Sequence, residues 1–152
     1  DITVSSVPVP PDPGKAGKET IAGIDANTNG VRDDVERFIV FSYPDNTPAH
    51  ANTRNALFQY AGAAQEGLIV AEDREAARAA GEEVQEAVEC GWLVMDNDID
   101  SASRAQNEIT AQLLNTVART KAHSHYSSQL SGKIFHLDSG PISAENCHFE
   151  VL

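Results

Sequence analysis

Twelve consecutive residues, 25–36, carry oxygen-bearing side chains at a spacing that would surround a hard cation. Oxygen stands at the first, third, fifth, ninth and twelfth positions, and glycine stands at the sixth. The side chains in question are Asp25, Asn27, Asn29, Asp33 and Glu36. Calcium takes about six to eight oxygen ligands at about 2.3–2.6 Å, which suits alternate side chains around a tight turn. The spacing therefore predicts a calcium loop.

Two neighbouring residues complete the expected ligand geometry. Gly30 permits a sharp bend, because a residue without Cβ reaches positive φ at no steric cost. Val31 follows and would offer its backbone carbonyl, while Glu36 lies where a longer side chain can return with both carboxylate oxygens. We expect Asp33 to bind directly or through water. The predicted ligands are Asp25, Asn27, Asn29, Val31, Asp33 and Glu36.

The stretch resembles an EF-hand loop, and it resembles even more the stand-alone loops of thrombospondin type-3 repeats and similar bacterial secreted proteins. The shared form is Asp-x-Asn/Asp-x-Asn/Asp-Gly-aliphatic-x-Asp-x-x-Glu, which residues 25–36 satisfy throughout. A paired EF-hand has an aliphatic eighth residue, where this chain has Arg32. Gly17 and Gly23 weaken any helix before the loop. The resemblance therefore implies a single unpaired loop with only a following helix.

The same residues also allow an explanation without metal. Asn29 and Gly30 form a favourable turn dipeptide. Asp33 and Glu36, three residues apart, could form a capping-box-like helix start. These features leave the first two oxygen-bearing positions unexplained, so we favour calcium over a plain capped helix.

The elements that must position the loop are helical. Apolar residues recur at helical spacing over residues 33–43, 49–70, 72–95 and 102–128. Asp100 or Ser101 could cap the last of these helices. Residues 96–100 also alternate oxygens but lack a glycine bend and a terminal glutamate, so a cap is favoured there over a second cation site. Residues 131–152 lose helical periodicity and predict an irregular tail over the bundle, with a short strand as an option.

The first 18 residues are expected to form an extended arm. Four prolines lie within six residues, at 8–13, which excludes a helix and favours a polyproline-like segment. In bacterial surface lipoproteins such a segment often tethers the folded body to a lipidated cysteine, which is what the resemblance suggests. The alternative is an arm packed along its own domain, since Ile2, Val4, Val7 and Val9 are apolar. Residues 19–152 are predicted to form one helical domain.

The two cysteines, Cys90 and Cys147, bear on the compartment. An even count in a chain with extracellular calcium chemistry predicts one disulfide. The alternative is a pair of free thiols, as in a cytosolic protein. We favour the bridge, because a calcium loop of modest affinity would have no ion at cytosolic calcium levels. The chain is therefore expected to be extracytoplasmic: periplasmic, secreted or lipid-anchored at the cell surface.

Composition excludes several classes of partner. The chain of 152 residues, 41% of them hydrophobic, is long enough for one domain with a core. Its formal net charge of −12 would repel phosphate backbones and anionic lipid surfaces, which argues against nucleic-acid binding. No run of about 18 apolar residues is present, so no transmembrane segment is expected.

Catalytic candidates are few. The late histidines, His123, His125, His136 and His148, raise the possibility of zinc. His123 and His125 are two residues apart, about 200° around a helix, so they cannot share a face. Surface histidines are the favoured interpretation. The glutamates at 82, 83, 86 and 89 are expected to form a solvated face, and no nucleophile or phosphate-binding motif is found.

These observations predict an all-α protein: a bundle of about four helices, with an extended N-terminal arm, one EF-hand-like calcium loop and an irregular C-terminal tail. The leading hypothesis is a non-enzymatic, extracytoplasmic structural or interaction module in which Ca²⁺ stabilises the start of the first helix. Its partners would be calcium and another protein at the cell surface or in the periplasm. The alternative is a zinc-dependent, hydrolase-like enzyme that uses the late histidines.

Overall fold

The computed structural model describes residues 7–136 and 140–152, and within these ranges the chain is helical and has no strand. The α-helices are α1 (Asp33–Ser42), α2 (Pro48–Ile69), α3 (Arg74–Val94), α4 (Ile99–Leu113) and α5 (Val117–Gln129). Two short 3₁₀ helices are η1 (Ala16–Lys18) and η2 (Ala144–Asn146). The predicted all-α fold is confirmed. No helix in the described part of the chain combines the length and apolar character that crossing a membrane requires.

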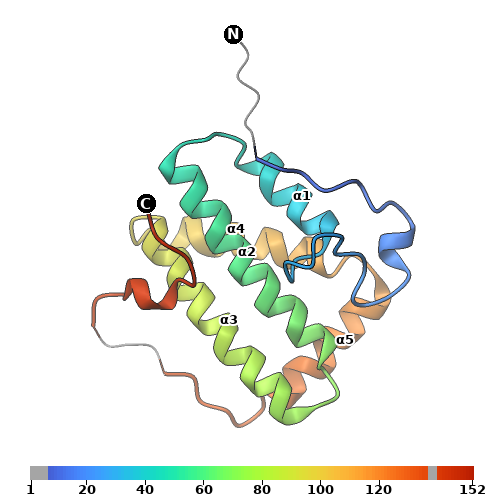
Figure 1. The fold of residues 1–152 in the computed structure, drawn as a ribbon. Helices are drawn as coiled ribbons and strands as arrows, with labels where there is room; N and C mark the ends of the chain where they lie inside the picture. The colour runs from blue at the N-terminus through green and yellow to red at the C-terminus, as the bar shows by residue number, and fades with distance from the viewer. Residues whose placement is uncertain (1–6, 137–139) are drawn as a thin grey trace.

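The helices surround one main core. Helices α2 and α3 lie side by side, α4 crosses behind them, and α1 packs against α2 and α4 (Figure 1). Helix α5 completes the bundle against α2 and α3. The apolar stripe expected along the second helix, at Leu57, Ala61, Ala64 and Leu68, faces the core: three of these side chains are buried and Ala64 is partly buried against them. The core also contains Val31, Val35, Ile39, Ala77, Ile109 and Leu113.

The prediction of one continuous helix over residues 102–128 is wrong. Helix α4 ends at Leu113, and α5 begins at Val117 after Thr116, whose hydroxyl accepts a hydrogen bond from the Arg119 backbone N–H at 3.2 Å. Val117 continues the apolar spacing of α4, yet its side chain is 74% exposed. Apolar periodicity identifies which face of a helix is buried, but it does not reveal where a helix is interrupted. Because Thr116 caps a new helix, the described residues form five α-helices, whereas about four were expected.

The turn at residues 96–100 caps a helix, as predicted, although one residue differs. Asp98, rather than Asp100 or Ser101, is the N-cap of α4. Its Oδ1 accepts from the Ser101 N–H at 3.0 Å and its Oδ2 from the Ser101 hydroxyl at 2.6 Å. These hydrogen bonds lower the pKa of the Asp98 carboxyl.

The C-terminal tail is fixed to the bundle by the predicted disulfide, which is confirmed. Cys90 in α3 and Cys147 in the tail are bonded, with Cα atoms 5.0 Å apart and a sequence separation of 57. In Figure 1 the tail returns across α3 toward α2. The optional short strand is not found in the described residues of the tail, which contain only η2.

Amide side chains of α2 form the hydrogen bonds with the tail's backbone that a neighbouring strand would form in a sheet. Gln59 donates from Nε2 to the Asn146 carbonyl at 2.8 Å and accepts the His148 N–H on Oε1 at 2.9 Å. Asn52 exchanges two hydrogen bonds with the backbone of Leu152, at 3.1 and 2.9 Å. The tail therefore lies against the bundle on both sides of Cys147 without forming a sheet.

The described part of the N-terminal arm contacts its own domain. Arg37 of α1 donates from Nη1 to the Pro10 carbonyl at 2.8 Å. Val9 is 38% exposed. Ile2 and Val4 lie outside the described residues. The contact at Pro10 is consistent with an arm packed along the domain, and the tether to a lipid anchor stays a prediction.

Candidate metal centre

The first half of the predicted calcium loop is a series of side-chain-to-backbone hydrogen bonds around a bend. Asp25 accepts the Asn29 N–H on Oδ1 at 3.2 Å and the Gly30 N–H on Oδ2 at 2.8 Å. Asn27 Oδ1 also accepts from the Asn29 N–H, at 3.2 Å, and Asn29 Oδ1 accepts from the Val31 N–H at 2.9 Å. Gly30 has φ of 84°, the conformation expected for the bend. The oxygens of the first, third and fifth positions thus all accept hydrogen bonds from the loop's own backbone.

The second half of the loop folds back over the first. Asp33 accepts the Ala26 N–H on Oδ1 at 3.0 Å. Glu36 lies one turn into α1, and its Oε2 accepts from Asn29 Nδ2 at 3.1 Å. Both Glu36 oxygens also lie 3.4 Å from Asn27 Nδ2. The oxygen-bearing side chains of the predicted ligand set therefore belong to one local network.

The alternative of a plain capping box is wrong for this helix start. The N-cap of α1 is Arg32, and no side chain caps the helix. A capping box needs the Asp33 carboxylate on the Glu36 N–H, but that N–H donates to the Arg32 carbonyl at 2.9 Å. The Asp33 carboxylate reaches back to Ala26 instead. The two carboxylates are thus directed toward the loop and not toward the first turn of the helix.

Two carboxylates at the end of the loop are buried close to each other in sequence. Asp33 is 2% exposed and Glu36 is 6% exposed. Burial raises the pKa of Glu36, hydrogen bonds from Asn29 and Asn27 lower it in part, and the charges of Asp33 and Asp25 add to the increase. A raised pKa means that the ionised carboxylate is disfavoured in this environment. A bound cation would reverse that preference.

The carboxylates of residues 25–36 lie farther apart in this structure than the ligands of a bound calcium ion would. Within the described residues, the one group of three His, Cys, Asp or Glu side chains with ligand atoms all within 4.8 Å is Glu83, Glu86 and His148. The amide N–H groups of Asn27 and Asn29 contact Glu36 directly. A cation would have to draw the Glu36 oxygens away from these amides.

Arg32 attaches the loop to α4, a role that sequence reasoning missed. Its guanidinium is 1% exposed and binds Asp34 through two hydrogen bonds, at 2.8 and 2.7 Å. It also donates to the carbonyls of Leu113 and Gln112 at the end of α4, at 3.0 and 3.1 Å. A cation is favoured at a helix C-terminus. The eighth position, which in a paired EF-hand contacts a second loop, here fastens the single loop to its own bundle.

Arg119 holds the segment before the loop, where the absence of an entering α-helix is confirmed. Its side chain is fully buried and donates to the carbonyls of Gly17 at 2.6 Å, Thr20 at 2.9 Å and Ile21 at 3.2 Å. Gly23 has φ of +64°, and a Cβ there would lie 2.8 Å from Arg119 Nη2. The arginine thus satisfies backbone carbonyls that no helix satisfies, and the positive φ beside it favours glycine.

Asn115 and Asp34 join the two arginines into one polar network. Asn115 Oδ1 accepts from Arg119 Nη1 at 2.6 Å, and its Nδ2 donates to Asp34 Oδ2 at 3.0 Å. Burial raises the pKa of Asp34, but the hydrogen bond and charge of Arg32 outweigh it, so that the pKa lies below its usual value. Arg32 therefore binds the Asp34 carboxylate directly, and Arg119 is connected to it through Asn115. The only sequence signal for this network was an arginine at an aliphatic position of the loop.

The structure gives the late histidines different partners. His125 on α5 contacts Glu72, and His123 packs beside Tyr126 with ring centroids 6.2 Å apart. His148 in the tail lies beside Glu86 on α3. The expected solvated glutamate face is wrong at Glu89, which is 6% exposed because η2 covers it and Asn146 donates to it.

Comparison of the chain with known proteins finds no match among protein-family models, curated proteins or solved structures. The functional argument therefore depends on the residues and their geometry. The likeness of residues 25–36 to an EF-hand loop stays a prediction.

Proposed function

We propose that residues 25–36 bind one Ca²⁺ and that the protein is a non-enzymatic, extracytoplasmic structural or interaction module. The observation that carries the proposal is the network around the bend at Gly30, in which oxygen-bearing side chains at the expected positions contact one another or the loop backbone. Carboxylate, amide and carbonyl oxygens are the ligands that calcium prefers. The ligand set is Asp25, Asn27, Asn29, Val31, Asp33 and Glu36.

Calcium would act on the start of α1. Asp33 and Glu36 belong both to the proposed ligand set and to the first turn of that helix. Val35, between them, is fully buried in the core. An ion that offsets the repulsion among the loop carboxylates would therefore stabilise the loop, the helix start and their attachment to the bundle together. Binding to the folded state alone adds about 2.7 kcal/mol at a free concentration one hundred times the dissociation constant.

The disulfide supports the extracytoplasmic part of the proposal. Such bonds form and persist in oxidising compartments, where free calcium is also plentiful. The bond between Cys90 and Cys147 is the kind of cross-link expected there. A protein partner at the cell surface or in the periplasm completes the proposed role.

Thermal unfolding in excess calcium, excess magnesium and chelator tests the proposal. We expect calcium to raise the midpoint well beyond magnesium, because Mg²⁺ demands a near-octahedral site and gives up its water reluctantly. Glu36→Gln should remove most of this rise by deleting a bidentate carboxylate. Glu75→Gln is the matched control, since Glu75 lies in the first turn of α3 and is exposed. Three superimposable curves for the unmodified protein would refute calcium binding.

A further inference from the structure

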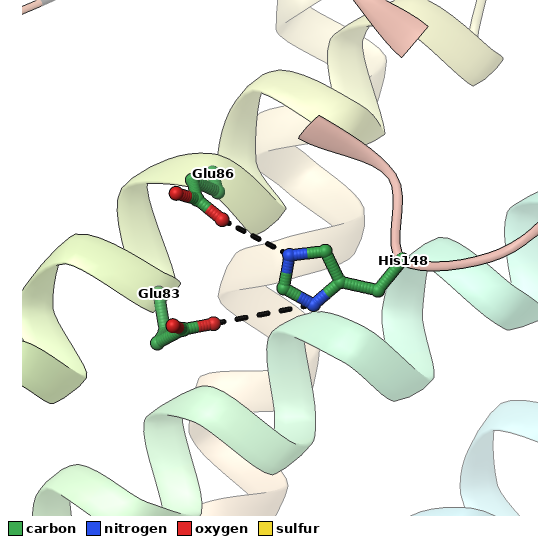
Figure 2. Close-up of side chains that lie close together, drawn as sticks. All are labelled: Glu83, Glu86 and His148. Carbon is green, nitrogen blue, oxygen red and sulfur yellow. Dashed lines mark hydrogen bonds and ion pairs between the residues drawn. The ribbon is translucent and has the colours of Figure 1, made fainter. Parts of the chain in front are cut away.

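A second group of side chains of types that can bind metals lies between α3 and the tail. Glu83 and Glu86 project from α3, and His148 reaches between them from the tail (Figure 2). His148 Nε2 is 3.0 Å from Glu86 Oε2, and its Nδ1 is 4.0 Å from Glu83 Oε2. One ligand atom from each of the three residues lies within 4.8 Å of the others. The two carboxylates face different ring nitrogens, so an ion held by one nitrogen requires the carboxylate beside the other to turn toward it.

The backbone holds all three side chains in place. Glu83 and Glu86 are three residues apart on one helix, so they occupy the same face. His148 directly follows Cys147, which is bonded to Cys90 on the same helix. The His148 N–H also donates to Gln59 of α2 at 2.9 Å. The imidazole is thus attached to two helices through its own backbone, and the exposed glutamate side chains are the parts that must turn to meet one ion.

In the part of the chain that the structure describes, no lysine or arginine pairs with either carboxylate. Within the described residues, His148 is the ion-pair partner of both Glu83 and Glu86, whereas the adjacent Glu82 pairs with Lys133. An imidazole nitrogen and carboxylate oxygens are ligands of Zn²⁺, at about 2.0–2.2 Å. Calcium and magnesium favour all-oxygen sites instead. The ligand chemistry of this group therefore differs from that of the loop.

A cleft of about 480 Å³ adjoins the group. Glu83 and His148 form part of its wall, and Asn29 and Val31 of the calcium loop form another part. Phe58 and Phe149 also line it. Zinc sites with three protein ligands keep one position for water or substrate. The cleft gives solvent and small molecules access to such a position.

We propose that Glu83, Glu86 and His148 bind one Zn²⁺ at the edge of this cleft, in a site separate from the calcium loop. Each carboxylate supplies one oxygen and the imidazole supplies one nitrogen. The disulfide and Gln59 orient the histidine. This assignment does not depend on calcium binding by residues 25–36.

Isothermal titration of metal-free protein with Zn²⁺, in saturating calcium, tests the assignment. We expect saturable binding of one Zn²⁺ per chain, which His148→Ala abolishes and Glu86→Gln weakens by at least about tenfold, or about 1.4 kcal/mol. Two matched controls should bind zinc as the unmodified protein does. They are His125→Ala, a histidine paired with another glutamate, and Glu82→Gln, a neighbouring carboxylate on α3. Far-ultraviolet circular dichroism and thiol labelling verify that each variant is folded and disulfide-bonded.

Several results would overturn the assignment. Absence of saturable binding would make His148 a simple ion-pair partner of the two glutamates. Equal losses in His125→Ala and His148→Ala would indicate non-specific binding to surface histidines. Loss of zinc binding in Glu36→Gln, with His148→Ala unaffected, would place the ion in the loop. As a second readout, Co²⁺ should give a visible absorption spectrum with the unmodified protein that His148→Ala lacks.

Discussion

Opening the disulfide between Cys90 and Cys147 should lower the free energy of unfolding by about 4 kcal/mol. The two cysteines are separated by 57 residues. On the chain-entropy model, closing a loop of this length removes about 14 cal/mol/K of entropy from the unfolded chain, which gives about 4 kcal/mol at room temperature. Domains of this kind are typically stable by about 5–15 kcal/mol, so the bridge supplies a large part of the total.

The reduced protein should nevertheless keep its fold in the absence of denaturant. The tail retains the hydrogen bonds of Gln59 and Asn52 with its backbone. Phe149 and Val151 still pack in the small apolar cluster around Cys90. These contacts hold the tail when the covalent bond is absent, so the effect of reduction should appear on unfolding and not in the helical content.

Urea unfolding followed by far-ultraviolet circular dichroism measures the effect. With an m-value of about 2 kcal/mol/M, reduction should move the midpoint to lower urea by about 2 M. The double variant Cys90→Ala, Cys147→Ala is the control, because it should unfold near the reduced protein and ignore reductant. Coincident midpoints for oxidised and fully reduced protein would refute the reasoning. They would mean that residual contacts of the tail restrict the unfolded chain as much without the disulfide as with it.

Two further outcomes are expected. Asp34→Asn removes the carboxylate that pairs with the buried Arg32 and that Asn115 connects to Arg119. Because the Asp34 side chain keeps 23% exposure, we expect a loss of stability near the lower end of the range for breaking a buried ion pair, about 3 kcal/mol. A loss of less than about 1 kcal/mol in chemical denaturation would contradict this. In chelator, the raised pKa of Glu36 should make the folded protein lose stability as pH rises above its ordinary value of 4.5, because the unfolded chain ionises there first. Glu36→Gln lacks this titration, so the unmodified protein should lose stability relative to the variant between acid and neutral pH, and a difference independent of pH would rule the effect out.

Short-range features of the fold were predictable because neighbouring residues determine them. Gly30 bends the loop and Asp25 accepts its N–H, as the spacing of the loop implies. The stripe through Leu57 and Leu68 faces the core, as helical periodicity requires. The break before Val117 was missed because its apolar side chain matches the period of α4 although it is exposed.

The candidate site was predictable only in part. The positions that could bind calcium followed from residue type and spacing. The attachment of the loop did not, because Arg119 contacts Gly17 across a separation of 102 residues. The second group was missed for the same reason, since His148 and Glu86 are 62 residues apart.

The sequence by itself determined the helical class, the oxygen-bearing residue types of the loop and which two cysteines could pair. Helical class and ligand spacing depend on residues within a few positions of one another, and two cysteines leave only one intramolecular pairing. Only the tertiary structure decided where Arg32 and Arg119 find acceptors and that His148 lies between two glutamates. Proximity between distant segments depends on how the helices pack and where the disulfide closes the chain, and no local pattern of residues encodes either.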